Sequence, residues 1–238
     1  MILIVRQTKR APKPQYSILS ATNGDSVGTV ESIKDEMLNM LLNYSISGRI
    51  GRMVLGEKEE GASSLKEENA KSLKEKLREA FTFKVYEQKT LLGRIYGEIK
   101  DIKKFGIFGY GYPYYKIDTE SELYCAYEYG EGRKGGHYWS MYRENLLVGM
   151  IERVQITHNT YDNYVIYCEE PEVAFWLIML SIQIDNLKYS NYTNQMGPLK
   201  TKEVYDSRLM PKELKDKYDN RYIDRIKQAE HTIQSMEL

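Results

Sequence analysis

The chain has 238 residues, the size of one large domain or two small ones. Lys and Arg number 34 and Asp and Glu also number 34, so the chain lacks the overall basic excess of a nucleic-acid-binding protein. Hydrophobic residues make up 42% and charged residues 29%, which argues against disorder over the whole length. The 21 tyrosines far outnumber the 5 phenylalanines, and they predict many half-buried strand surfaces.

Three segments have the pattern of a β-hairpin with the same feature in the return strand. Each has a strand, a polar turn and a second strand with an apolar-Gly-x-apolar motif. They are residues 16–30 with Gly28, 83–95 with Gly93, and 138–151 with Gly149. Glycine weakens a strand unless a bulge, a bend or a close approach requires it. The recurrence predicts a bend that is repeated around a closed or strongly curled sheet; chance similarity is the alternative.

Further alternating segments lie between these hairpins. Residues 114–129 and 154–168 alternate on both sides of polar turns, and residues 44–55 have a weaker pattern of the same kind. Strands and turns at such short, regular intervals favour a barrel or a sandwich.

Residues 57–80 interrupt this β pattern with a highly charged insert. They are rich in helix-forming residues, but Leu65, Leu73 and Leu77 supply only a thin apolar stripe. A solvated helix and a disordered loop are both compatible with this composition.

The segment 170–187 predicts a helix that is apolar on every face. Pro171 suits the first helical turn, and the acidic residues beside it complement the helix dipole. The apolar stretch 173–184 would span about 18 Å, which is short of the roughly 30 Å of a bilayer core. We therefore expect a helix buried inside a barrel rather than a membrane span.

The C-terminal residues 191–238 predict a polar linker followed by a helical tail. Pro211 can begin a helix with an apolar stripe on one face. The stripe consists of Leu214, Tyr218, Tyr222, Ile226 and Ile233. It can dock on its own domain, on a partner or on a second copy of the chain.

The chain resembles the tubby C-terminal-like superfamily, which includes the plant LURP-one-related proteins and the phospholipid scramblases. The hairpin from Phe83-Lys84-Val85-Tyr86 to Leu92-Gly93-Arg94-Ile95 is similar to LURP-one-related members. The segment from Pro171-Glu172-Val173-Ala174 to Ile184-Asp185 is similar to the closing helix of the superfamily. The resemblance covers residues 1–190 and implies a closed antiparallel β-barrel around a hydrophobic helix. It also implies phosphoinositide or membrane-lipid binding, although the signature blocks that close true tubby proteins are absent.

The sequence has no motif that indicates catalysis, a metal site or a cofactor. The three histidines lack metal-ligand spacing, and there is neither a Cys-x-x-Cys nor a Gly-x-Ser-x-Gly motif. Cys125 and Cys168 lie in strand-like flanks and are interpreted as reduced, structural thiols. We therefore expect a protein that is not an enzyme.

Two loops combine features of a lipid-binding surface. One contains Lys100, Lys103, Lys104 and Phe105 in a glycine- and tyrosine-rich stretch, and the other carries Arg133 and Lys134 on a glycine-rich tip. Aromatic rings beside lysines suit an anionic membrane surface. A bend between barrel strands and ordinary solvated charge are the alternative interpretations.

These observations predict a tubby-like barrel over residues 1–190, with the charged insert at 57–80 and the helical tail at 191–238. The expected function is a non-enzymatic binding module for anionic phospholipid or phosphoinositide headgroups. An adaptor that binds proteins through the C-terminal helix is the alternative, and a hydrolase with a composite site is a third hypothesis without a motif. We expect no nucleic-acid partner. Because no signal peptide or membrane span is evident, we also expect a cytoplasmic protein, with peripheral membrane contact under the lipid hypothesis.

Overall fold

The computed structural model describes residues 1–9, 13–32, 40–58, 82–102, 110–130, 136–154, 163–185 and 212–236. The strands of this part of the chain are β1 (Ile2–Lys9), β2 (Gln15–Ser20), β3 (Ser26–Ser32), β4 (Met40–Ile46), β5 (Arg49–Lys58), β6 (Phe83–Glu87), β7 (Thr90–Ile102), β8 (Tyr110–Thr119), β9 (Leu123–Gly130), β10 (His137–Arg143), β11 (Leu146–Val154) and β12 (Asn163–Cys168). The helices are α3 (Pro171–Ile184), α4 (Lys212–Lys215) and α5 (Asn220–Met236).

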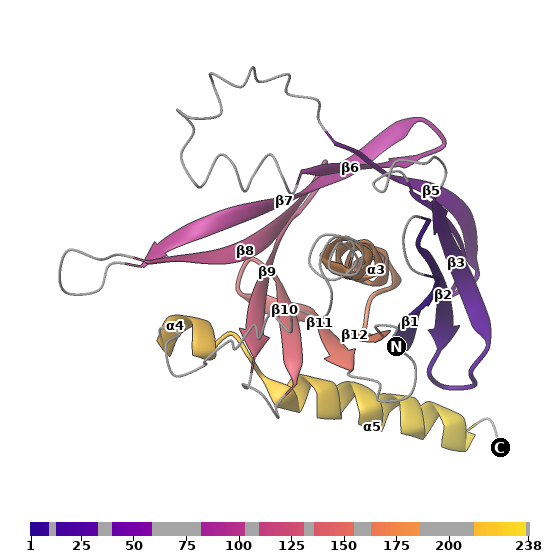
Figure 1. Cartoon of the computed structure of the whole chain (residues 1–238). Coiled ribbons are helices and arrows are strands. Elements are labelled where there is room, and N and C mark those ends of the chain that lie inside the picture. The colour runs from indigo at the N-terminus through magenta and orange to yellow at the C-terminus, as the bar shows by residue number, and fades with distance from the viewer. Residues whose placement is uncertain are drawn as a thin grey trace, which may run out of the picture.

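The twelve strands form a closed antiparallel barrel (Figure 1). Each strand pairs with the next one in the sequence, and β1 pairs with β12 to close the ring. Each of the described strands is therefore paired on both sides. Side chains alternate between the interior and the surface, as in β9, where Tyr124, Ala126 and Glu128 are buried while their neighbours are more exposed. The predicted mainly-β class and closed antiparallel barrel are confirmed.

The three recurrent glycines lie at three β-bulges in equivalent hairpins. Gly28 pairs with Ile18, Gly93 with Val85 and Gly149 with Met141, and the register shifts immediately beside each pair. Each bulge inserts the apolar residue before the glycine as an extra residue in the return strand. The repeated bend predicted from the sequence is therefore present.

Helix α3 forms much of the hydrophobic core. Every residue from Val173 to Ile184 is buried, and these side chains share one cluster with the inward side chains of the barrel strands. The helix packs mainly against β1, β11 and β12, and Figure 1 shows the strands drawn around it. The close packing on β11 depends on Gly149, where an added Cβ would lie 2.5 Å from Leu177 Cδ1.

The C-terminal helix α5 packs on the outer face of the barrel (Figure 1). Tyr222, Ile223 and Ile226 are buried against Met150 and Tyr167 of β11 and β12. The Tyr222 hydroxyl also donates a hydrogen bond to the carbonyl of Val148 at 2.6 Å. The middle of the predicted stripe, Tyr218, Tyr222 and Ile226, thus packs on its own domain, which was one of the three outcomes left open, while the side chain of Ile233 lies outside the described residues.

The prediction of a single helix beginning at Pro211 is wrong in one respect. The chain forms the short α4 and then begins α5 at Asn220. The interruption has a local cause: a side-chain oxygen of Asp219 accepts the backbone N–H of Arg221 at 3.1 Å, so Asp219 caps a new helix start.

The predicted insert at 57–80 begins in regular structure, because β5 continues to Lys58. The remaining insert residues lie outside the described residues, as do residues 186–211, which include the start of the predicted linker at 191. In the described part of the chain, no helix is both long and apolar enough to cross a bilayer.

Candidate functional site

The two ends of the barrel differ in the connections that they carry. Five short turns, between β2 and β3, β4 and β5, β6 and β7, β8 and β9, and β10 and β11, lie at one end, which we call the turn end. The other six strand connections, with lengths up to 24 residues, leave from the opposite end, which we call the loop end. Because α3 follows β12 directly, it starts at the turn end and finishes at the loop end.

The residues predicted to bind lipid lie in or beside two connections of the loop end. Lys100 lies in β7, where its backbone pairs with Tyr112 of β8. The other five lie outside the described residues: Lys103, Lys104, Phe105, Arg133 and Lys134. The connection that contains Lys103, Lys104 and Phe105 joins β7 to β8, and the one that contains Arg133 and Lys134 joins β9 to β10. Strand β8 pairs with β9. Both connections therefore leave from neighbouring strand ends, although they are separate in the sequence.

Exposed basic side chains of the first hairpin lie at the same end. Arg6 and Lys9 of β1 and Lys13 before β2 are all exposed. Gln7 pairs with Tyr16 and Arg6 pairs with Asn163 of β12, which fixes this hairpin at the loop end of the barrel. The closed topology thus gathers described positive charge at the end where the two predicted basic loops begin.

A buried polar cluster lies beneath the loop end, at the end of α3. The Asp185 carboxylate is fully buried and accepts hydrogen bonds from the Tyr16 hydroxyl (2.5 Å), the Gln7 amide (2.9 Å) and the Tyr164 hydroxyl (3.0 Å). A carboxylate at a helix C-terminus is unfavourable for the helix dipole, so these donors are needed to hold it in the interior. They tie α3 to β1, β2 and β12.

A second buried carboxylate lies nearby on β9. Glu128 is 2% exposed, and one of its oxygens lies 2.7 Å from Nε2 of His137. The His137 ring packs on Trp139, with ring centroids 4.2 Å apart. His137 is the first residue of β10.

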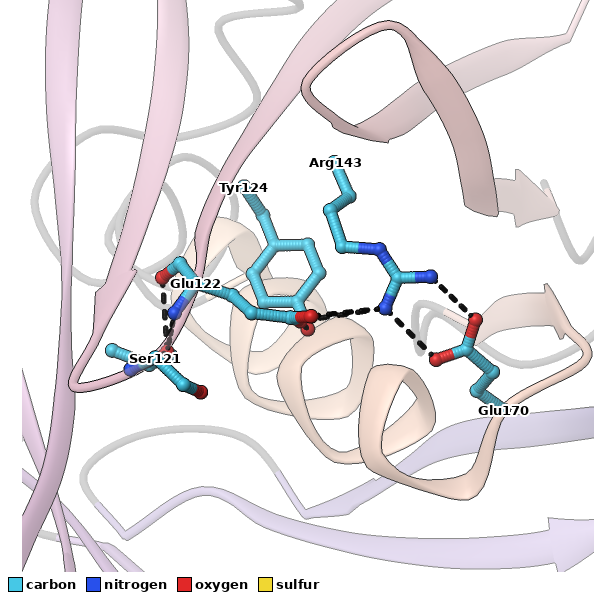
Figure 2. A network of polar contacts seen from close by, with 6 residues as sticks. Ser121, Glu122, Tyr124, Arg143 and Glu170 are labelled. Atoms are coloured by element: carbon cyan, nitrogen blue, oxygen red, sulfur yellow. Dashed lines mark hydrogen bonds and ion pairs between the residues drawn. The ribbon is translucent and has the colours of Figure 1, made fainter.

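At the turn end, an ionic network holds the start of α3 (Figure 2). The Arg143 guanidinium donates two hydrogen bonds to the Glu170 carboxylate, at 2.8 and 3.1 Å, and a third to Glu122 at 3.2 Å. Tyr124 donates to the same Glu122 side chain. The network joins β10 to the turn before β9 and to the residue that precedes α3.

A cavity of about 230 Å³ opens beside this network, between α3 and the strands β4 to β8. Its position follows from barrel size, because barrel diameter grows with strand number and α3 packs mainly on the opposite side. Its lining includes Tyr44 and the α3 residues Phe175 and Trp176, together with the acidic residues Glu87, Glu120 and Glu172. Sequence analysis did not identify this cavity, since its lining comes from six separate segments.

The cysteines have the environment of structural thiols. Cys168 is fully buried, and burial raises its pKa to about 12, which leaves the thiol protonated at neutral pH. Burial also raises the pKa of Cys125. No group of three or more His, Cys, Asp or Glu side chains suited to a metal ion occurs among the described residues.

No protein-family model, no curated protein and no solved structure matches this chain. The similarity to the tubby C-terminal-like superfamily therefore rests on the sequence patterns described above and stays a prediction.

Proposed function

We propose that the protein is a non-enzymatic binding module whose loop end contacts anionic phospholipid headgroups. The observation that carries this proposal is the barrel topology. It brings the exposed Arg6 and Lys9 to the end from which the connections 103–109 and 131–135 leave. Basic residues near an anionic membrane each contribute about 1 kcal/mol to binding, so several at one end of a rigid domain are sufficient for reversible attachment.

We also infer that the barrel holds α3 as a permanent, enclosed core, as in a tubby-like domain. The buried surface around α3 supports this, and both of its ends are tied. Asp185 bonds to three strands at the loop end, while Arg143 holds Glu170 at the turn end. A barrel filled in this way has no open lumen for a lipid headgroup, so we expect headgroups to bind at the outer rim of the loop end.

Co-sedimentation with liposomes tests the lipid proposal. We expect binding to vesicles that contain phosphatidylserine or phosphoinositide, no binding to pure phosphatidylcholine, and weakening by salt because the attraction is electrostatic. Changing Arg6 and Lys9 to Gln removes two charges and is expected to reduce the vesicle affinity roughly 30-fold, or about 2 kcal/mol. Lys89→Glu, an exposed position at the turn end, changes the net charge by the same amount and serves as the control.

The variants separate a local site from a general charge effect. Equal losses in Lys89→Glu and in the Arg6/Lys9 variant would mean that net charge, not the loop end, governs binding. Retained binding after changing Lys100, Lys103 and Lys104 to Glu would remove the predicted lysine loop from the site. Absence of binding to every vesicle would refute the proposal and favour the adaptor hypothesis. The tail stripe is packed on the barrel, so an adaptor would have to release α5 or use another surface.

A further inference from the structure

The cavity at the turn end has the features of a small-ligand site that is separate from the proposed lipid surface. Its volume of about 230 Å³ is below the 300–1,000 Å³ of pockets for drug-sized ligands. The occupant is therefore small, with one ring or a short chain. The cavity is open at the turn end and does not involve the loop-end residues.

The deep wall of the cavity is aromatic and fixed in position. Phe175 and Trp176 are 4% and 6% exposed, and the rings of Tyr44 and Phe175 lie with centroids 4.4 Å apart. Two glycines allow this arrangement: a Cβ at Gly51 would lie 2.2 Å from the Tyr44 hydroxyl, and one at Gly93 would lie 3.0 Å from the Trp176 ring. Such a wall buries the apolar body of a ligand, and ring faces also attract cations.

The charged side chains that line the cavity are all acidic. Glu87, Glu120 and Glu172 contribute to its lining, whereas no lysine or arginine does so among the described residues. Glu87 accepts a hydrogen bond from the Tyr44 hydroxyl at 2.8 Å, which orients its carboxylate beside the aromatic wall. The Arg143 guanidinium in the network of Figure 2 is engaged by Glu170 and Glu122. A cationic ligand is therefore favoured and an anionic one is repelled.

We propose that this cavity binds a small organic amine in its protonated form. The ammonium group lies toward the carboxylates of Glu87 and Glu172, and the apolar body packs against Trp176. Glu172 also complements the positive end of the α3 dipole, so its charge has a structural role as well as the proposed binding role. A purely structural role for Glu172 would not explain the aromatic wall or the cavity beside it.

Calorimetric titration of the full chain with phenethylamine tests the proposal. The matched anion 3-phenylpropanoate has a similar ring and chain with the opposite charge. We expect saturable binding of phenethylamine and none of 3-phenylpropanoate at the same concentrations. No saturable binding of the amine, or equal binding of the two compounds, would overturn the proposal.

Charge-neutral variants locate the site. Glu87→Gln combined with Glu172→Gln is expected to weaken phenethylamine binding at least tenfold. Glu31→Gln combined with Glu144→Gln, two exposed positions away from the cavity, removes the same net charge and is expected to leave the affinity within twofold. Equal affinities in the two double variants would refute the assignment.

A variant at the rim keeps the test valid if the first double variant folds poorly. Glu120 is exposed in the turn before β9, so Glu120→Arg leaves the core intact and places a positive charge at the mouth. Binding of phenethylamine is expected to fall at least tenfold in this variant, and an unchanged affinity would contradict the proposal. The Arg6/Lys9 variant of the loop end is expected to bind the amine like the unmodified protein, so failure of the lipid proposal is distinguishable from failure of this one.

Discussion

Replacement of Gly93 by alanine tests whether the β-bulges bring backbone and core into contact as the structure shows. The new Cβ would lie 2.6 Å from the carbonyl oxygen of Asp118, in the paired strand β8, and 3.0 Å from the Trp176 ring. A backbone oxygen within a sheet cannot move away without breaking the pairing. Overpacking of this kind costs about 1–3 kcal/mol, and the reduced entropy of the unfolded chain offsets about 0.4–1 kcal/mol of it.

We therefore expect Gly93→Ala to lower the free energy of unfolding by about 1–2 kcal/mol, which corresponds to a fall in Tm of about 2–8 °C for a domain of this size. Urea unfolding followed by circular dichroism measures the change. Gly149→Ala is the comparison, because its shortest contact is with a side-chain atom, Leu177 Cδ1 at 2.5 Å, and its backbone contact, Tyr167 O at 3.3 Å, is longer than that at Gly93. We expect a smaller cost there than at Gly93. Equal costs at the two positions, or a neutral Gly93→Ala, would refute this reasoning.

Four further predictions concern the ends of α3, the thiol and the tail. Asp185→Asn leaves the hydroxyl donors of Tyr16 and Tyr164 facing an amide donor in a buried site, so the free energy of unfolding measured in urea is expected to fall by about 2–3 kcal/mol. A neutral effect would mean that the cluster does not hold the end of α3. Arg143→Met removes the two-bond ion pair with Glu170, which is partly exposed, and should lower the free energy of unfolding by about 1 kcal/mol. The decrease should be smaller in high salt, and a decrease that does not depend on salt would contradict an ionic role. Burial raises the pKa of Cys168 from 9.0 to about 12 in the folded state, so the stability that this thiol contributes is complete below pH 9 and is lost as the pH rises toward 12. The urea midpoint of the unmodified protein should fall between pH 8 and pH 10.5, and that of Cys168→Ala should fall by less. Identical falls in the two proteins would exclude this thiol as the cause. Ile226→Ala truncates a side chain that is 1% exposed, so it is expected to lower the free energy of unfolding by about 2–4 kcal/mol and to increase proteolysis of the tail. An unchanged cleavage pattern would mean that α5 docks by other contacts.

The β-hairpins and the central helix were predictable because local patterns specify them. Alternation marked most strands, and the glycine motif marked the three bulges, since glycine is required wherever a neighbouring backbone approaches closely. The break at Asp219 was not predicted, because an apolar stripe continues across it and only the cap reveals the new helix start. The buried polar cluster had one signal in the sequence, the single acidic residue Asp185 at the end of an apolar helix. Its hydrogen-bond donors come from strands far away in the chain, so the sequence did not reveal the cluster.

The candidate sites depended much more on the tertiary structure. The sequence identified basic and aromatic loops, and only the closed topology assigned those loops to the same end as Arg6 and Lys9. The cavity had no local signal, because Tyr44, Glu87 and Trp176 lie on separate elements that come together only in the folded chain.

By itself, the sequence determined the class of the domain, the position of its apolar helix and the places where the sheet bends. These properties follow from side-chain period, chain length and glycine position, which act over a few residues. The tertiary structure decided which strand ends share a rim, which carboxylates are buried with donors and where a cavity remains. Those properties depend on contacts between residues far apart in the chain, and such contacts are set by the pairing of the twelve strands into a barrel.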